Sequence, residues 1–422
     1  METKNEVLVL GAGLAGLIAA WQASARGKKV RLISKGWGAT HWHTGCVDVL
    51  GYWPVGAEEA ITNPGQAIPK LLEANSGHPY ARVGLDSISE ALKALQDLCA
   101  QNDYPLLGSL DKNWRLPSAV GAPRPTCLAP AAMIAGDLDD QAPILVVGFK
   151  HFSDFQPNLV ADNLKQIGLS ASYAVLDLPS LAQRHGFTGI ILAQMMEQEA
   201  FQAEVVKAIR PHLADAARIG LPAVLGVQGA SAVHKAFEEQ LGLPVFEIPG
   251  LPPSVAGIRL HHILKDAIEG NGGRVFDGME AVGCETQNGR VAAVYTETAA
   301  RNRSHRYQQY VLATGGILGG GITADHAGQV REVIFDLPLD TPESRLEWFR
   351  QDFLDAQGHP IYRSGVVVDD NLRPLDGDGG VLYENLHAAG TTLAGCDAIA
   401  ERSFDGVALA TGYVAGRLVA SA

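Results

Sequence analysis

A glycine-rich turn between an apolar strand and a helix constrains the fold of this chain more than any other feature. Residues 7–10 (Val-Leu-Val-Leu) predict a buried strand of a parallel sheet. Gly11, Gly13 and Gly16 follow at the spacing GxGxxG, and residues 17–25 predict a helix. A second short strand comes next, and the whole segment spans about 30 residues, which is the context that the dinucleotide-binding fingerprint requires.

Each of the three glycines has its own task in such a turn. Gly11 permits the tight turn, Gly13 lets the backbone approach a phosphate, and Gly16 lets the helix pack on the strand. Residues 7–25 also have the length of a membrane span, but their glycines and the lack of a basic leader argue against a span or a signal peptide. Because helix N-terminal amides attract anions, we predict that a phosphate-containing cofactor is bound by Gly11, Ala12, Gly13, Leu14, Ala15 and Gly16.

The second predicted strand lacks the acid that usually ends it. In dinucleotide-binding folds that carboxylate binds the adenosine ribose, but no Asp or Glu occurs between residues 7 and 47. The strand ends instead in Ser34 and Lys35, where a hydroxyl can bind a ribose weakly and an ammonium can meet a phosphate. The region at the carboxyl ends of these two strands therefore suits a cofactor that ends in phosphate, such as FMN. FAD is the alternative, and NADP fits less well.

A loop rich in small, hydroxyl and histidine residues follows at residues 36–51. It would cross the carboxyl ends of the sheet, where ligands bind. His41 and His43 are two residues apart, so an extended segment would point them the same way. They are either site groups facing the cofactor or substrate, or structural histidines of the loop. We place Thr44 and Gly45 among the cofactor contacts, and we expect no metal.

The composition excludes several classes of function. The chain has 422 residues with 33 Lys and Arg against 46 Asp and Glu, a net charge of −13, which argues against nucleic acid and against direct adhesion to anionic lipid. Its five cysteines are scattered without a Cys-x-x-Cys, so we expect no iron–sulfur or zinc site within this chain. Such scattered cysteines suit a reducing cytosol.

Two later segments resemble further flavin contacts of Rossmann-type flavoproteins. One is a predicted strand that runs into Thr314, Gly315 and Gly316. The other is a short strand ending at Gly390, followed by a loop and a small-residue helix over 407–418. In flavoproteins with such a segment, the helix N-terminus can stabilise negative charge on the reduced flavin. From this segment we predict cofactor contacts by Gly390, Gly406, Val407 and Ala408.

The middle of the chain is predicted to be a separate domain. Residues 55–249 alternate helices with short strands, and a Pro-Gly-Leu-Pro-Pro segment marks a hinge back into the first domain. The predicted fold class is α/β, a Rossmann-type FAD/NAD(P)-binding flavoprotein fold with an inserted α+β capping domain. Residues 1–54 and 250–422 would form the discontinuous flavin-binding domain, and residues 55–249 the capping or substrate domain.

The glycine motifs resemble the flavoprotein superfamily that contains fumarate reductase. Over nearly the full length, the chain more closely resembles the family of anaerobic glycerol-3-phosphate dehydrogenase B subunits. The segments that carry this closer resemblance are GATHWHTGCVDVLG, PSAVGAPRPTCLAP, VVGFKHFSDFQPNLVADNL, PIYRSGVVVDDNLRP and AAGTTLAGCDAIAERSFDGVALATGYVAG. The resemblance implies oxidation of sn-glycerol 3-phosphate to dihydroxyacetone phosphate, with electrons passing to a quinone. It also implies FMN, a partner flavoprotein (the A subunit), and an iron–sulfur partner (the C subunit) that attaches the cytoplasmic chain to the inner face of the membrane without insertion of its own.

Oxidation of a secondary alcohol needs a hydride acceptor and a base for the hydroxyl proton. His41 or His43 is our candidate base, because histidine titrates near neutrality. The substrate phosphate needs a cation, for which Arg363, Arg402 and Arg124 are candidates. Two alternatives remain open at this stage. One is a non-catalytic flavin scaffold that relays electrons within the complex, and the other is a soluble flavin oxidoreductase similar to fumarate reductase.

Overall fold

The computed structural model describes residues 6–182, 186–297 and 302–422. The chain forms two compact units. Unit 1 comprises Met1–Thr40, Asp48–Leu95 and His261–Ala422, and unit 2 comprises His41–Val47 and Gln96–Leu260. Residues 55–95, which the sequence analysis placed in the insertion, thus lie in unit 1.

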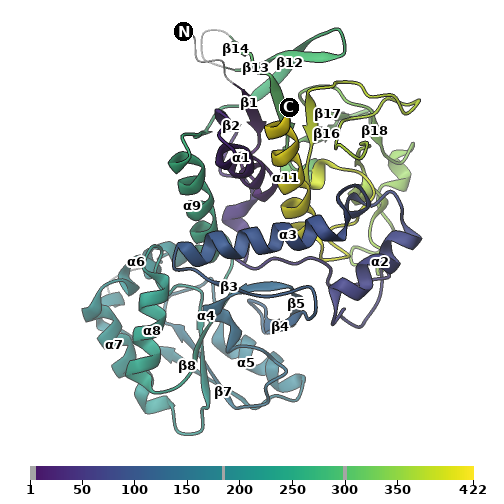
Figure 1. Cartoon of the computed structure of the whole chain (residues 1–422). Helices are drawn as coiled ribbons and strands as arrows, with labels where there is room; N and C mark the ends of the chain where they lie inside the picture. Colours follow the sequence, from purple (N-terminus) through teal and green to yellow (C-terminus); the bar gives the residue numbers. More distant parts are fainter. Residues whose placement is uncertain (1–5, 183–185, 298–301) are drawn as a thin grey trace. The chain divides into compact units, whose positions relative to one another are not determined.

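Unit 1 is built on a five-stranded parallel sheet (Figure 1). Its strands, in spatial order, are β11 (Arg274–Asp277), β2 (Val30–Ser34), β1 (Val7–Leu10), β15 (Gln309–Leu312) and β20 (Leu386–Ala388). β1 is buried at every residue, as expected for a central strand covered on both faces. The sequence after residue 272 predicts a small meander of strands that begins at residues 274–275 and has a hairpin turn at Asn288-Gly289. Instead, β11 pairs in parallel with β2 and forms the edge of the sheet.

Two helices of small residues, α1 (Leu14–Ala25) and α11 (Phe404–Ser421), lie side by side in unit 1 (Figure 1). A Cβ atom added to Gly412 would lie 2.4 Å from the carbonyl oxygen of Ala15, so only glycine allows this approach. The apolar stretch of residues 7–25 is therefore a strand and a buried helix, as its glycines predicted. Among the described residues, none of the helices is long and apolar enough to cross a membrane.

The rest of unit 1 consists of shorter elements. A three-stranded antiparallel sheet includes the hairpin predicted at Asn288-Gly289, whose φ angles of 50° and 68° are both positive, as its two-residue turn requires. The remaining elements of unit 1 are α2 (Pro64–Ala74), β12 (Ala281–Gln287), β13 (Arg290–Thr296), β14 (Arg303–His305), α10 (Gly316–Gly319), β16 (Ile322–Ala324), β17 (Val330–Glu332), β18 (Leu339–Asp340) and β19 (Gly365–Val366). Helices α3 (Pro79–Gln101) and α9 (Val255–Gly270) contain residues of both units.

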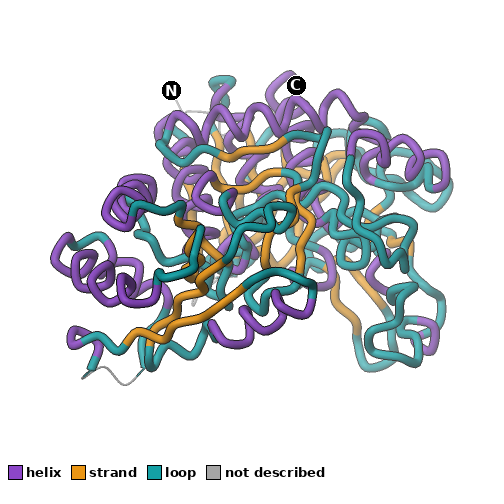
Figure 2. The backbone as a smooth tube through the Cα atoms, turned by 90° about the horizontal axis from the view of Figure 1, so that it is seen from below, coloured by secondary structure: helices purple, strands orange, loops and turns teal. Residues whose placement is uncertain are grey.

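Unit 2 has a four-stranded parallel sheet of its own, in the order β10 (Val245–Ile248), β9 (Arg218–Pro222), β7 (Ile144–Phe149) and β8 (Ala171–Leu176). This unit is therefore mainly α/β, whereas the sequence analysis predicted α+β. The difference follows from the buried apolar strand β7, which needs helices on both faces. Figure 2 shows the backbone of the whole chain, with its helices in purple and its strands in orange. The helices and smaller strands are α4 (Ala131–Ile134), α5 (Pro157–Gln166), α6 (Gly189–Met196), α7 (Glu199–Ile209), α8 (Ala230–Leu241), β3 (Leu106–Gly108), β4 (Trp114–Pro117), β5 (Pro123–Thr126) and β6 (Leu128–Pro130).

Candidate functional site

The first glycine turn has the geometry of a phosphate cradle. Gly11 has φ +111°, and a Cβ atom there would lie 2.2 Å from the carbonyl oxygen of Ala313. A Cβ atom on Gly16 would lie 2.0 Å from the carbonyl oxygen of Gly11. Gly13 is the N-cap of α1 and makes no side-chain capping hydrogen bond, and a Cβ atom there would meet nothing within 4 Å among the described residues. The first amides of α1 therefore begin at an open position, where a phosphate would fit.

A second glycine turn lies beside the first, because β15 pairs in parallel with β1. Gly315 and Gly316 both have positive φ, and a Cβ atom on Gly316 would lie 2.2 Å from the carbonyl oxygen of Thr391. The Gly315 amide donates to Thr392 Oγ1 at 3.0 Å. Thr314 Oγ1 is buried and has no hydrogen-bond partner among the described residues. A buried hydroxyl without a partner among the described residues, in the second glycine turn, fits a polar cofactor group.

The third predicted segment reaches the same edge of the sheet. β20 pairs in parallel with β15, and Gly390 follows it with its amide donating to Thr411 Oγ1 of α11 at 2.8 Å. A Cβ atom on Gly390 would lie 2.9 Å from the Cβ atom of Ala15. The structure thus brings together three segments that are far apart in the sequence, at the carboxyl edge where ligands bind parallel sheets.

The start of α11 is closely packed against other residues of unit 1. The Gly406 amide donates to the carbonyl oxygen of Asp48 at 2.9 Å, and a Cβ atom there would lie 2.2 Å from the Tyr80 hydroxyl. Val407 and Ala408 are also buried, at 0% and 4% exposure. In this structure, the backbone of Gly406 serves packing, whereas the side chain of Phe404 faces the recess described next.

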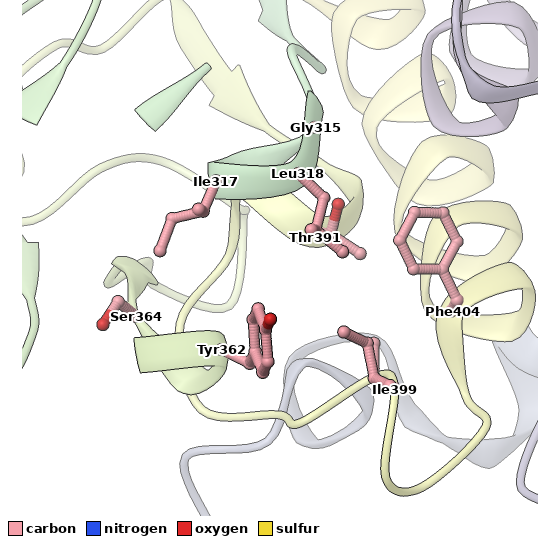
Figure 3. A pocket seen from close by; sticks show the side chains of 9 residues that line it. Gly315, Ile317, Leu318, Tyr362, Ser364, Thr391, Ile399 and Phe404 are labelled. Atoms are coloured by element: carbon pink, nitrogen blue, oxygen red, sulfur yellow. The ribbon is translucent and has the colours of Figure 1, made fainter. Parts of the chain in front are cut away.

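A small, largely apolar recess opens beside the second glycine turn and the first residue of α11 (Figure 3). Ile317 and Leu318 form one wall, and Ile399 and Phe404 lie across from them with Tyr362 below (Figure 3). Apolar and aromatic walls with few polar groups suit a flat heteroaromatic ring. The full lining is Gly315, Ile317, Leu318, Tyr362, Ser364, Thr391, Ala398, Ile399 and Phe404.

The loop after β2 begins against the first turn. Gly38 has φ +64°, and a Cβ atom there would lie 2.4 Å from the carbonyl oxygen of Ala12. Thr40 is buried, and its Oγ1 lies 3.5 Å from the same carbonyl oxygen. Neither Gly38 nor Thr40 was among the residues predicted from the sequence. The available signal was a glycine in a loop that had to cross the carboxyl ends of the strands.

The two histidines of this loop belong to unit 2 and are not in an extended segment. Residues Ala39–Trp42 form a 3-10 turn, so the extended segment that would point His41 and His43 the same way is not present. The His41 side chain is buried at 6% exposure, and its carbonyl oxygen accepts from the Ser254 amide. His43 Nδ1 accepts from the Gly45 amide at 3.0 Å.

The other residues predicted in this loop have local partners in unit 2. Thr44 Oγ1 accepts a hydrogen bond from Arg124 Nη1 at 2.6 Å. This contact holds the side chain of Arg124, one of the candidate phosphate-binding arginines. Gly45 has φ +83°, and a Cβ atom there would lie 2.7 Å from the Cβ atom of Ala256. The backbone of Gly45 is therefore fixed by packing on α9.

A carboxylate from the neighbouring strand β11 lies beside the end of β2, which has no acidic residue of its own. Ser34 is aligned with Asp277 of β11, and its Oγ lies 3.1 Å from Asp277 Oδ1 and 2.8 Å from the carbonyl oxygen of Gly36. The Lys35 ammonium pairs with Glu280 at 2.7 Å, so it is not the unengaged cation that the sequence suggested. The neighbouring strand therefore supplies an acid that an inspection of β2 alone could not find.

The two C-terminal arginines have different surroundings. Arg363 lies between two recess residues, Tyr362 and Ser364, and its carbonyl oxygen accepts from the Gly395 amide. Its positive charge also acts to lower the pKa of Asp397, although burial leaves that pKa raised overall. Arg402 has a left-handed backbone with φ +48°, and its guanidinium lies 6.0 Å from the ring centre of Tyr52. Arg363 is thus the one placed next to the recess.

The chain is similar to known proteins of one family over nearly its whole length. The family described as FAD binding domain matches residues 6–403. The probable anaerobic glycerol-3-phosphate dehydrogenase B subunit of Halobacterium salinarum is 36% identical over 100% of this chain and 99% of that protein. The anaerobic glycerol-3-phosphate dehydrogenase B subunit of Pasteurella multocida is 30% identical over 98% of each. The open conformation of a flavocytochrome c3 fumarate reductase is 10% identical, with a TM-score of 0.46, over 100% of this chain and 78% of that one.

The family match covers nearly the whole chain and confirms both the resemblance and the dehydrogenase class predicted from the sequence. A flavin is accordingly the cofactor of the fold. The chain belongs to the family of anaerobic glycerol-3-phosphate dehydrogenase B subunits, which are flavin-dependent oxidoreductases.

Proposed function

We propose that this chain is a flavin-dependent subunit of a glycerol-3-phosphate:quinone oxidoreductase, which oxidises sn-glycerol 3-phosphate to dihydroxyacetone phosphate. The observation that carries the proposal is the convergence of three glycine-rich segments on one sheet edge beside an apolar recess. The relatives named as B subunits supply the substrate class. The proposed partners are the flavoprotein A subunit and the iron–sulfur C subunit, through which the chain would lie on the inner face of the cell membrane and pass electrons to quinone.

The flavin would be held by the two glycine turns, with its ring in the recess. The amides of Gly13 and Leu14 would face a phosphate, and Thr314 Oγ1 would donate to another polar group of the cofactor. Bound flavin would supply the two-electron acceptor that oxidation of an alcohol requires. In this proposal unit 2 is the capping or substrate domain.

We propose FAD as the flavin, with FMN, the cofactor predicted from the sequence, as the alternative. The absence of an acid from β2 was the argument for FMN. Asp277 weakens that argument, because its carboxylate lies at the end of β2 and could accept from a ribose hydroxyl. Mass spectrometry of the flavin released from purified protein distinguishes the two.

His41 is the better of the two candidate bases. Because His43 Nδ1 accepts from a backbone amide, the neutral His43 ring carries its proton on Nε2 and has no lone pair left for the substrate. His41 is therefore our first candidate for the group that would take the hydroxyl proton. Arg363, which flanks the recess, is the first candidate for the substrate phosphate, and Arg402 and Arg124 are the others.

The test is a dye-linked assay of glycerol 3-phosphate oxidation on the chain co-purified with its partner subunits. We expect His41→Gln to lower kcat by about 10²- to 10⁴-fold, the usual contribution of a general base, with the flavin content unchanged. His43→Gln serves as the matched control. If the double variant His41→Ala, His43→Ala is still reduced by substrate at the wild-type rate, the base assignment is wrong.

A second candidate function is a flavin scaffold that relays electrons without oxidising substrate. The burial of His41, at 6% exposure, favours it, because a buried ring has little access to a soluble substrate. In that case the flavoprotein partner would oxidise glycerol 3-phosphate, and both histidine variants would keep the activity of the complex. Bleaching of the flavin by reductant, followed by reoxidation with fumarate, would instead indicate an oxidoreductase similar to fumarate reductase.

A further inference from the structure

The loop that leads into α11 presents some residues to the recess and buries others. Ala398, Ile399 and Phe404 line the recess. Glu401, from the same loop, does not line it and is only 2% exposed. Arg402 lies between Glu401 and Phe404, and the chain turns there through a left-handed backbone conformation that non-glycine residues rarely adopt.

Two neutral groups donate to Glu401. His78 Nε2 lies 3.1 Å from Glu401 Oε2, and Ser403 Oγ lies 3.0 Å from the same oxygen. The Tyr80 amide donates to His78 Nδ1 at 3.1 Å, so the neutral imidazole carries its proton on Nε2 and donates it to Glu401. His78 is fully buried. Glu401 Oε2 thus accepts from two neighbouring groups, as an oxygen of an ionised carboxylate can.

The position of this charge matters for a ligand in the recess. Glu401 lies three residues before the first residue of α11, whose N-terminus carries a partial positive charge. That partial charge would stabilise a negatively charged ligand, whereas the buried carboxylate would destabilise it. Because the donors His78 and Ser403 are neutral, they would leave the negative charge of an ionised Glu401 uncompensated in a region of low dielectric constant.

We propose that Glu401 is an electrostatic positioning residue that lowers the reduction potential of a flavin bound in the recess. It does so by opposing the negative charge that the flavin gains on reduction and by offsetting the N-terminus of α11. This inference rests on the proposed function, since it needs the flavin ring to occupy the recess. A lower potential favours the onward passage of electrons from this chain.

The test is a spectroelectrochemical titration of the flavin in the purified holoprotein. We expect Glu401→Gln to shift the midpoint potential to a more positive value by about 30 mV or more, which is a tenfold change in the equilibrium constant for a two-electron couple. Glu401→Asp retains the charge and should retain the potential. Glu90→Gln is the matched control, because Glu90 is an exposed acid that pairs with Arg417, near the other end of α11.

The outcomes separate this inference from the proposed function. An unchanged potential in Glu401→Gln, in a complex that still oxidises glycerol 3-phosphate, overturns the inference alone. A holoprotein that shows the positive shift but does not oxidise glycerol 3-phosphate overturns the substrate assignment alone. If Glu401→Gln does not retain flavin, Glu401→Ala and Glu401→Asp are compared, and equal displacement of the potential in both variants overturns the role of the charge.

Discussion

At the scale of single residues, two glycines of the first turn have different reasons to be glycine. Gly11 has a backbone conformation that side chains rarely adopt, and a Cβ atom there would overlap the carbonyl oxygen of Ala313. Gly13 has an ordinary φ of −72°, and the described residues leave open space around it. The first glycine therefore serves the fold, whereas the second serves a ligand that approaches the start of α1.

Substitution by alanine should separate these two roles. We expect Gly13→Ala to leave the free energy of unfolding of the flavin-free protein within about 1 kcal/mol of wild type, because its φ suits alanine. Flavin affinity should nevertheless fall. Gly11→Ala should destabilise the protein by at least about 1–3 kcal/mol. Urea unfolding measures the stability, and fluorescence titration with flavin measures the affinity. Unchanged flavin affinity in Gly13→Ala would contradict the proposal that the first glycine turn binds a phosphate of the flavin.

The carboxylate beside Ser34 yields a second residue-scale prediction. If Asp277 binds the ribose of FAD, Asp277→Asn should weaken the binding of FAD by about 1.5–3 kcal/mol, which is the usual range for a hydrogen bond to a charged group. The affinity for FMN, which has no adenosine ribose, should stay unchanged. Titration of the flavin-free protein with each flavin measures this selectivity. Glu280→Gln removes a neighbouring exposed acid that pairs with Lys35 and is the control. Equal loss of both flavins would exclude the ribose contact.

At the scale of elements, local pattern predicted what depends on local sequence. The strand at 7–10, the turn and the helix follow from an apolar run and glycine spacing, and the structure has them as β1 and α1. The pairing of β11 with β2 was missed, because Asp277 and Ser34 are 243 residues apart and only the sheet brings them together. The conformation predicted for the loop that contains His41 and His43 was wrong for a different reason. An extended conformation was assumed for a segment that contains a 3-10 turn.

Within unit 2, a buried ion pair joins β10 to α9. Arg259 donates to both carboxylate oxygens of Glu247, at 2.6 and 2.9 Å, and through Nε to the carbonyl oxygen of Gly226 at 2.8 Å. Both side chains are at most 3% exposed. The pair thus fixes the loop after β9, whose Leu225 amide also donates to Glu247.

Removing one partner of this pair should be costly. We expect Arg259→Met to destabilise the protein by about 3–5 kcal/mol, because it leaves a buried carboxylate without its cation. The double variant Arg259→Met, Glu247→Leu should recover much of that loss. Lys150→Met breaks an exposed pair with Asp177 and should cost at most about 1 kcal/mol. Urea unfolding measures all three, and a double variant no more stable than Arg259→Met would contradict this account.

At the scale of the whole molecule, buried acids link stability to pH. Asp397 is 1% exposed, and its pKa is raised by burial and by the neighbouring charge of Glu401, with Arg363 acting in the opposite direction. Glu332 also has a raised pKa, because burial outweighs the backbone amides that donate to it. A raised pKa in the folded state means that the folded protein holds its proton more tightly than the unfolded chain. The stability that this supplies is full below the unfolded pKa and is lost as the pH rises through the folded pKa.

Asp397→Asn should remove the contribution of Asp397 from this pH dependence. Asparagine keeps the acceptor for the Ala400 amide, which now bonds to Oδ1, and removes the charge from an oxygen that has no partner among the described residues. The gain in stability over wild type should therefore be small near pH 4 and grow with pH, by up to about 1.4 kcal/mol for each unit by which the folded pKa exceeds the unfolded one. Urea unfolding at several pH values between 4 and 8 measures the difference, and Asp370→Asn, which removes an exposed charge, is the control. If Asp397→Asn runs parallel to wild type across that range, Asp397 is not one of the groups that link the stability of this protein to pH.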